Sequence, residues 1–207
     1  MFQCNIAVTG LNAMDDPMAG IPVIRSIRSS KTWTGKIIGL TYDALDTGIF
    51  DYGLLDEVYL LPYPTEGEGA LSRRLRQIIS KTHLDVIIPN VDSEIPNFSK
   101  LDLELKEMGV NLLVPSEEQL RLRSKLNLEE FCRAHEFKVP KSRKIVDPGE
   151  IDRIAQELGF PLVIKGALHD AYLTSSREEA LVYYQKIRSR WGLPLIAQQY
   201  IWGEEYT

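Results

Sequence analysis

Short apolar runs alternate with amphipathic stretches along the first half of the chain. The runs have the length of strands, and they lie at 6–8, 36–40, 58–61, 86–88 and 110–114. Between them, the segments 23–27, 71–79 and 101–108 repeat their apolar residues with a helical period. This alternation predicts a parallel sheet covered by helices, and therefore an α/β fold.

Polar residues follow three of these runs, where the strands are expected to end. Ligands of open parallel sheets gather at the carboxyl ends of the strands, which makes Asn12 a candidate for substrate binding. Asp92 and Glu94 form a second candidate, because two carboxylates on a polar loop could hold an amine or an ammonium-like group. The alternative is a loop that merely caps the next helix.

The first strand is not followed by the glycine pattern of a dinucleotide site. Gly10 comes directly after the strand, but the next glycine is Gly20. The G-x-G-x-x-G spacing that lets the backbone approach a pyrophosphate is therefore missing. This counts against a nicotinamide cofactor.

The second half begins near Ser116, which forms a capping-box pair with Gln119 at the start of a predicted helix. Ser124 is expected to cap another helix, with Lys125 in its first turn. A helix N-terminus favours an anion through its free N–H groups and its dipole, and an ammonium beside it adds to the effect. Lys125 is thus a phosphate-binding candidate, or else a solvated lysine.

A second lysine ends a tight apolar strand. Asp147-Pro148 opens a predicted helix that Gly159 closes, and the strand 162–166 follows with Lys165 near its end. Desolvating an ammonium there is costly unless it meets an anion, so Lys165 is another phosphate-binding candidate. As a lone feature it would be read as a solvated strand terminus. Ser176 then caps a long helix that stops at Trp191, and a last strand covers 195–199.

Composition narrows the classes of function. The 207 residues carry a net charge of −5, which argues against a nucleic-acid surface. Two cysteines without zinc spacing read as buried thiols in a reducing compartment. No apolar run approaches the roughly 20 residues of a membrane span, and no signal peptide precedes the first strand. A cytoplasmic location is the default expectation, with no nucleic-acid or membrane partner.

The order of these motifs resembles the first part of an ATP-grasp enzyme. Lys125 comes first, then Phe160-Pro161-Leu162-Val163-Ile164-Lys165, then Gln198-Gln199-Tyr200-Ile201 with Glu205. The preceding block is similar to the pre-ATP-grasp domain of biotin carboxylase and of the carbamoyl-phosphate synthase large subunit. The resemblance implies a Rossmann-like pre-ATP-grasp parallel sheet over 1–115, followed by an incomplete α+β ATP-grasp domain over 116–207.

The resemblance also implies roles for single residues. Lys125 and Lys165 would contact the nucleotide phosphates, Gln198 and Gln199 would lie against the adenine amino edge, and the backbone N–H of Ile201 would bond the ring. Glu205 would accept from the ribose hydroxyls, which suits a carboxylate. Members of this superfamily also carry a glycine-rich loop over the phosphates, whereas the loop at 166–172 has one glycine. His169 could donate to a phosphate instead, or be a surface histidine of a short hairpin.

Magnesium ligands, by the same resemblance, are expected beyond Thr207. The favoured function is the N-terminal portion of a ligase of carbamoyl-phosphate-synthase type, which uses ATP and Mg²⁺ to activate a carboxylate for attack by an amine. This chain alone is expected to be inactive, and a homodimer is expected from the superfamily. A non-catalytic nucleotide-binding or assembly subunit is the alternative, and a dinucleotide-dependent oxidoreductase is a third reading.

Overall fold

A computed structural model describes residues 1–13, 17–167 and 169–204 of the chain. It divides into two compact units, Met1–Glu118 and Gln119–Thr207. The sequence placed this boundary at 115. Each unit is described below by itself.

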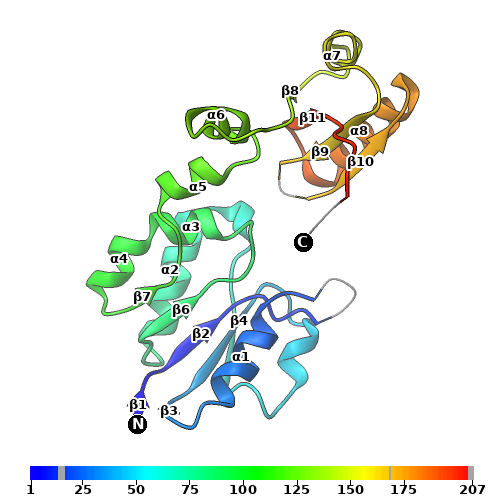
Figure 1. The fold of residues 1–207 in the computed structure, drawn as a ribbon. Coiled ribbons are helices and arrows are strands. Elements are labelled where there is room, and N and C mark those ends of the chain that lie inside the picture. The colour runs from blue at the N-terminus through cyan, green and yellow to red at the C-terminus, as the bar shows by residue number, and fades with distance from the viewer. Residues whose placement is uncertain (14–16, 168, 205–207) are drawn as a thin grey trace. The chain divides into compact units, whose positions relative to one another are not determined.

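The first unit is built on a parallel sheet (Figure 1). Its five strands are β2 (Ile6–Val8), β4 (Ile37–Thr41), β5 (Glu57–Leu60), β6 (Val86–Ile88) and β7 (Asn111–Leu112). They lie in the order β5-β4-β2-β6-β7. The strand β2 is central. The strands β4 and β5 lie on one side of it, and β6 and β7, which come later in the chain, lie on the other. The α/β class expected from the apolar runs is confirmed.

Helices cover both faces of this sheet, as such strands require. On one face, α1 (Gly20–Arg28) packs Ile21 and Ile24 against Val8 and Ile37. On the other face lie α2 (Glu68–Ile79), α3 (Ile95–Lys100) and α4 (Asp102–Glu107). The sequence predicted the helices over 71–79 and 101–108 but not α3.

Short elements complete the first unit. The strands β1 (Phe2–Gln3) and β3 (Trp33–Thr34) form a separate parallel pair that the apolar pattern did not reveal. Two single turns of 3-10 helix, η1 (Thr47–Phe50) and η2 (Pro64–Glu66), follow β4 and β5.

The second unit contains an antiparallel sheet of four strands. They are β8 (Ser142–Ile145), β9 (Leu162–Gly166), β10 (Ala171–Thr174) and β11 (Leu195–Gln199), in the order β10-β9-β11-β8. The bounds of β9 and β11 agree with those predicted. The strand β8 was not predicted, because its sequence Ser-Arg-Lys-Ile carries a single apolar residue.

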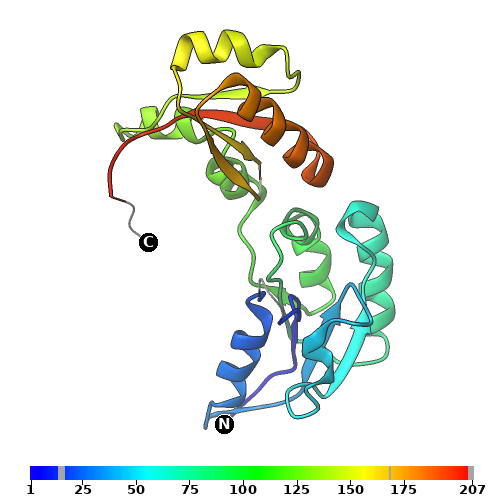
Figure 2. The same cartoon turned by 90° about the vertical axis from the view of Figure 1, so that its right-hand side faces the viewer.

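Two helices lie along one face of this sheet, α7 (Glu150–Leu158) in yellow and α8 (Arg177–Trp191) in orange (Figure 2). Their buried residues Ile151, Ile154, Tyr184 and Ile187 pack against Ile164 and its neighbours. The predicted N-cap of α8 is present, since Ser176 Oγ accepts from the N–H of Glu179 at 3.2 Å. Because α7 and α8 occupy one face, the side chains of the other face are left for different contacts.

Two shorter helices, α5 (Glu117–Arg123) and α6 (Leu128–Ala134), precede the sheet. Across the residues that the structure describes, no helix combines the length and the apolar character needed to cross a membrane.

Candidate functional site

Lys165 projects from the sheet face that α7 and α8 do not cover. In antiparallel strands directly opposed residues share a face, and Ile196 lies opposite Lys165 on β9 and opposite Lys144 on β8. Ile196 is buried although it lies outside the core cluster of the helix-covered face. The uncovered face therefore has an apolar centre with a lysine on each side.

The ammonium of Lys165 is half-buried, and its pKa is below the ordinary value. Burial is the main cause, and the positive charge of Lys125 lowers the pKa further. Within the described part of the chain no carboxylate forms an ion pair with Lys165. A half-buried ammonium that also feels the positive charge of a second lysine is a place where an anion is favoured.

Lys125 does not lie in the first turn of a helix, which corrects the sequence prediction. The helix α6 begins only at Leu128, and residues 124–127 form a turn in which the N–H of Asn127 donates to Ser124 O at 2.9 Å. The hydroxyl of Ser124 accepts from the N–H of Leu126, and the Asn127 amide donates to Arg121 O at the end of α5. These side-chain bonds favour a turn over another helical residue. The charge of Lys125 still reaches Lys165 from this turn.

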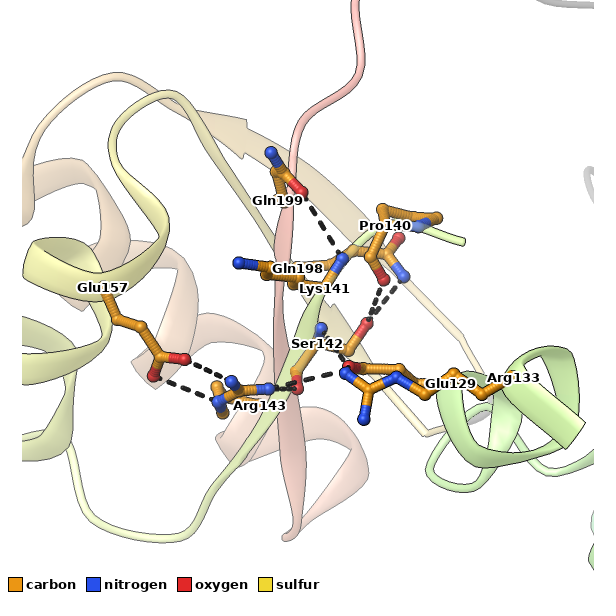
Figure 3. A network of polar contacts seen from close by, with 9 residues as sticks. All are labelled: Glu129, Arg133, Pro140, Lys141, Ser142, Arg143, Glu157, Gln198 and Gln199. Carbon is orange, nitrogen blue, oxygen red and sulfur yellow. Dashed lines mark hydrogen bonds and ion pairs between the residues drawn. The ribbon is translucent and has the colours of Figure 1, made fainter. Parts of the chain in front are cut away.

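The end of β11 supplies the expected adenine-side residues. Gln198 lies opposite Val163 and Ser142, on the same face as Ile196, and its amide donates to Ser142 Oγ at 2.8 Å. Gln199 bonds Lys141 through its backbone N–H at 2.8 Å, while its side-chain oxygen accepts a longer bond of 3.5 Å. Figure 3 shows both glutamines beside Ser142 at the end of the strand.

An ion-pair network holds this strand end in place (Figure 3). Arg143 on β8 makes a two-pronged contact with Glu157 of α7. Its neighbour Ser142 donates its N–H to Glu129 of α6 at 2.8 Å. Glu129 also pairs with Arg133. The position of Ser142, and with it the amide of Gln198, is thus fixed from two helices.

Beyond β11 the chain is exposed. Ile201 is 59% exposed and Trp202 77% exposed, and the Trp202 ring stands edge-on to Tyr200 with centroids 4.9 Å apart. Residues 200–204 line a hollow of about 310 Å³. Glu205, the expected ribose ligand, lies outside the described residues.

The loop after Lys165 is held against α8. Gly166 N–H donates to Asp170 O at 3.0 Å, and the His169 ring packs on Trp191 with centroids 4.7 Å apart. Leu168 lies outside the described residues. The histidine is therefore engaged with an aromatic ring at the loop, which fits the hairpin alternative of the two sequence readings.

In the first unit, Glu94 is used internally. Its side chain is only 1% exposed, and its carboxylate accepts from the hydroxyls of Thr9 and Tyr42 and from the N–H groups of Asn90 and Val91. Burial raises the pKa of Glu94, although all four hydrogen bonds oppose that shift. The same burial, with the charge of Glu94, raises the pKa of Tyr42. The proposed amine contact of Glu94 would compete with four internal donors. Glu94 is the N-cap residue of α3, but its side chain makes no capping bond to that helix, so the carboxylate ties the loop to Thr9 and Tyr42 and does not cap the helix.

Asn12 and Asp92 lie on the same two loops, after β2 and β6. Asn12 O accepts from Met18 N–H at 2.9 Å, and Asp92 is exposed. Substrate binding by these two side chains stays a prediction. In the described ranges, no three His, Cys, Asp or Glu side chains gather as a metal site.

Three side chains that contact the candidate residues were not predicted from the sequence as site residues: Tyr42, Ser142 and Trp191. Tyr42 follows an apolar run, so its position at a strand end was visible, but its partner Glu94 is 52 residues away. Ser142 lies in the strand that the apolar pattern failed to show.

No protein-family model and no curated protein matches this sequence. Solved structures do match it. L-amino acid ligase from Bacillus licheniformis has a TM-score of 0.69 at 16% identity, over 96% of this chain and 44% of its own. N5-carboxyaminoimidazole synthetase from Staphylococcus aureus, complexed with ADP, has a TM-score of 0.66 at 17% identity, over 96% and 48%.

A third match is the biotin carboxylase domain of 2-oxoglutarate carboxylase from Hydrogenobacter thermophilus, in complex with MgADP and bicarbonate. Its TM-score is 0.64 at 16% identity, over 97% of this chain and 45% of its own. All three are ATP-grasp enzymes.

The chain has an ATP-grasp fold. It spans about half the length of the structures it matches. A parallel α/β unit followed by an antiparallel α+β unit, the order expected from the sequence, agrees with these matches.

Proposed function

We propose that this chain is the nucleotide-binding part of an ATP-dependent ligase that activates a carboxylate for attack by an amine. The observation that carries the proposal is Lys165, a half-buried ammonium beside Lys125 on the uncovered face of the sheet. Among the residues that the structure describes, no carboxylate pairs with Lys165, and a half-buried ammonium of this kind is stabilised when an anion arrives. The phosphates of ATP are such an anion, and the ADP complexes of two matched enzymes support the choice.

The same face offers a place for the base. Val163 presents apolar surface there next to the buried Ile196, and Gln198 on the same strand face carries an amide. An adenine ring needs apolar contact with a few polar groups at its edge, which is the usual composition of small-ligand sites. Gln198 Oε1 would accept from the adenine amino group, and the N–H of Ile201 would donate to the ring. The ribose would be bonded by Glu205.

In the proposed reaction, a carboxylate oxygen of the substrate attacks the γ-phosphorus of ATP, and ADP leaves. The amine nitrogen then attacks the carbonyl carbon of the acyl phosphate, phosphate leaves, and a base takes the amine proton. Lys125 and Lys165 would hold the phosphates and offset their charge during the first step. Mg²⁺ would supply further charge neutralisation at the phosphates.

The matched enzymes include a ligase for L-amino acids, and others in complex with bicarbonate or 5-aminoimidazole ribonucleotide. We propose a small carboxylate or bicarbonate as the acceptor here, in a protein of carbamoyl-phosphate-synthase type. One matched biotin carboxylase domain is a dimer, which supports a homodimer.

A non-catalytic nucleotide-binding subunit is the second candidate, favoured by the glycine-poor loop that Trp191 and Asp170 fasten to α8. This candidate predicts ATP binding that is indifferent to Mg²⁺. The ligase predicts tighter binding of MgATP by the complete site.

The test is calorimetric titration of ATP into the wild-type protein, Lys165→Ala and Lys186→Ala. Lys186 is the control because it is exposed on α8, over the ring of Tyr172 at 4.6 Å, on the helix-covered side. The Lys165 variant is expected to lose about 1 to 3 kcal/mol of binding free energy, the value of a charge-assisted hydrogen bond. Equal ATP affinity in all three proteins would show that the uncovered face is not the phosphate site.

A further inference from the structure

Trp191 joins the last turn of α8 to the loop that follows Lys165. Its indole N–H donates to the Asp170 carboxylate at 2.7 Å, and its ring packs against the imidazole of His169. Arg190 approaches the same carboxylate oxygen at 3.8 Å. Two consecutive loop residues are therefore held by two consecutive helix residues.

The backbone of the loop is adapted to this arrangement. Asp170 has φ of 62°, a left-handed conformation that costs energy for a residue other than glycine. Gly166 has no room for a side chain, since a Cβ would lie 2.3 Å from His169 O. The contacts of Trp191 offset the strain at Asp170, and the loop is thereby closed on the end of β9.

The fold of the second unit does not need this contact for its core. The strand β10 is already paired with β9 over four residues, and α8 packs through Ala180, Tyr184 and Ile187. Trp191 lies one turn beyond Ile187 and is 47% exposed. Its hydrogen bond and ring contact thus serve the loop and add little to the packing of the sheet.

We propose that Trp191 is a positioning residue of the nucleotide site, which holds His169 and Asp170 in one conformation before the phosphates arrive. This inference rests on the proposed function, because it needs the phosphates of ATP beside Lys165. A loop that is fixed in advance loses less conformational freedom when it meets its ligand, so the ligand binds more tightly. The loop has one glycine, and Trp191 supplies order where a glycine-rich loop would have to be ordered by the nucleotide.

The experiment compares Trp191→Ala, Trp191→Phe and Asp170→Asn with the wild type. Affinities for ATP and for adenosine are measured together with hydrogen exchange of the loop amides. Trp191→Ala is expected to weaken ATP binding about five- to tenfold, the value of about one hydrogen bond, and to leave adenosine binding unchanged. Exchange at the amides of His169 and Asp170 should become faster. Trp191→Phe keeps a ring for His169 and should show a smaller loss.

Asp170→Asn keeps an oxygen acceptor for the indole N–H and should bind ATP almost as the wild type does. Tyr183→Ala is the control, because Tyr183 is another aromatic residue of α8, stacked on Tyr172 with centroids 4.3 Å apart. Loss of ATP and adenosine affinity by equal factors in Trp191→Ala would overturn the proposal, as would unchanged ATP affinity.

The two proposals fail in different ways. If the wild type binds no ATP, the proposed function fails and the positioning role fails with it, whatever the exchange rates show. If the wild type binds ATP and Lys165→Ala weakens it while Trp191→Ala does not, the function stands and the role of Trp191 alone is refuted.

Discussion

The charge of Lys125 lowers the pKa of Lys165, in addition to the larger effect of the burial of Lys165 itself. One lysine lies in the turn before α6 and the other near the end of β9, 40 residues later in the chain. The fold therefore brings together two ammonium groups whose repulsion an anion would relieve.

This relationship predicts that ATP binding takes up protons. Phosphate favours the charged ammonium, so it raises the lowered pKa of Lys165 toward its ordinary value. ATP affinity should then fall over the pH range in which the free protein loses the Lys165 proton, because burial and the charge of Lys125 lower the pKa of Lys165. Titrations in two buffers of different ionisation enthalpy measure the uptake. Lys125→Ala should reduce it, and heats independent of the buffer over that range would contradict the prediction.

Glu94 is expected to be essential for the stability of the first unit. Replacing it by alanine removes the acceptor of four donors, from Thr9, Tyr42, Asn90 and Val91. Each buried donor left without a partner is costly, so Glu94→Ala should lower the free energy of unfolding by about 3 kcal/mol or more. Glu94→Gln keeps an oxygen acceptor and should lose less. Chemical denaturation measures both, and equal losses would show that the hydrogen bonds are not the cause.

Because the pKa of Glu94 is raised in the folded protein, the free energy of unfolding of the first unit is expected to depend on pH. The folded state binds this proton more tightly than the unfolded state, so the stabilisation is complete below the ordinary value of 4.5 and is lost as the pH rises through the raised pKa. The difference in unfolding free energy between the wild type and Glu94→Gln should therefore change in favour of the glutamine variant as the pH rises above 4.5. A difference that stays constant would rule out titration of this carboxyl.

Much of the fold followed from the sequence where apolar residues were dense. The strands β2, β6, β9 and β11 have the predicted bounds, because each is a run of apolar residues buried in a sheet. Strand β8 was missed because pairing with β11, and not its own composition, makes it a strand.

The site was less accessible to sequence reasoning. Lys165 was found because a lysine in an apolar strand is unusual. The turn around Lys125 depends on side-chain hydrogen bonds of Ser124 and Asn127, which the pattern of apolar and polar residues does not predict. Glu94 looked like a ligand because its loop is polar. Its burial depends on hydrogen bonds from Thr9 and Tyr42, which are far from Glu94 in the sequence.

Glu129 is expected to hold the start of β8. Its carboxylate accepts from Ser142 N–H and pairs with Arg133. Glu129→Ala should lower the free energy of unfolding of the second unit by about 1 to 2 kcal/mol, because the N–H of Ser142 and the guanidinium of Arg133 lose their acceptor. Glu130→Ala is the matched control, because the neighbouring residue of α6 is exposed. Equal melting temperatures for the two variants would show that Glu129 does not stabilise the start of β8.

Gly20 should not tolerate a side chain. A Cβ there would lie 2.1 Å from Thr9 O and 2.4 Å from Gly10 O, both backbone atoms of the loop after β2. Gly20→Ala should therefore destabilise the first unit by about 3 kcal/mol, because the helix α1 would have to move away from the strand end. Gly53→Ala is the control, since its Cβ would meet a single atom, at 3.8 Å. Similar denaturation midpoints for both variants would contradict this.

The positions of the tryptophans allow their fluorescence to report on separate parts of the protein. Its three tryptophans lie in three environments: Trp33 donates to Cys4 O in the first unit, Trp191 touches the loop after Lys165, and Trp202 is exposed beyond β11. Variants that keep one indole each would give separate fluorescence signals for the parallel sheet, the loop after Lys165 and the segment that follows β11. Nucleotide that enters the proposed site should alter the last two emissions and leave that of Trp33 constant.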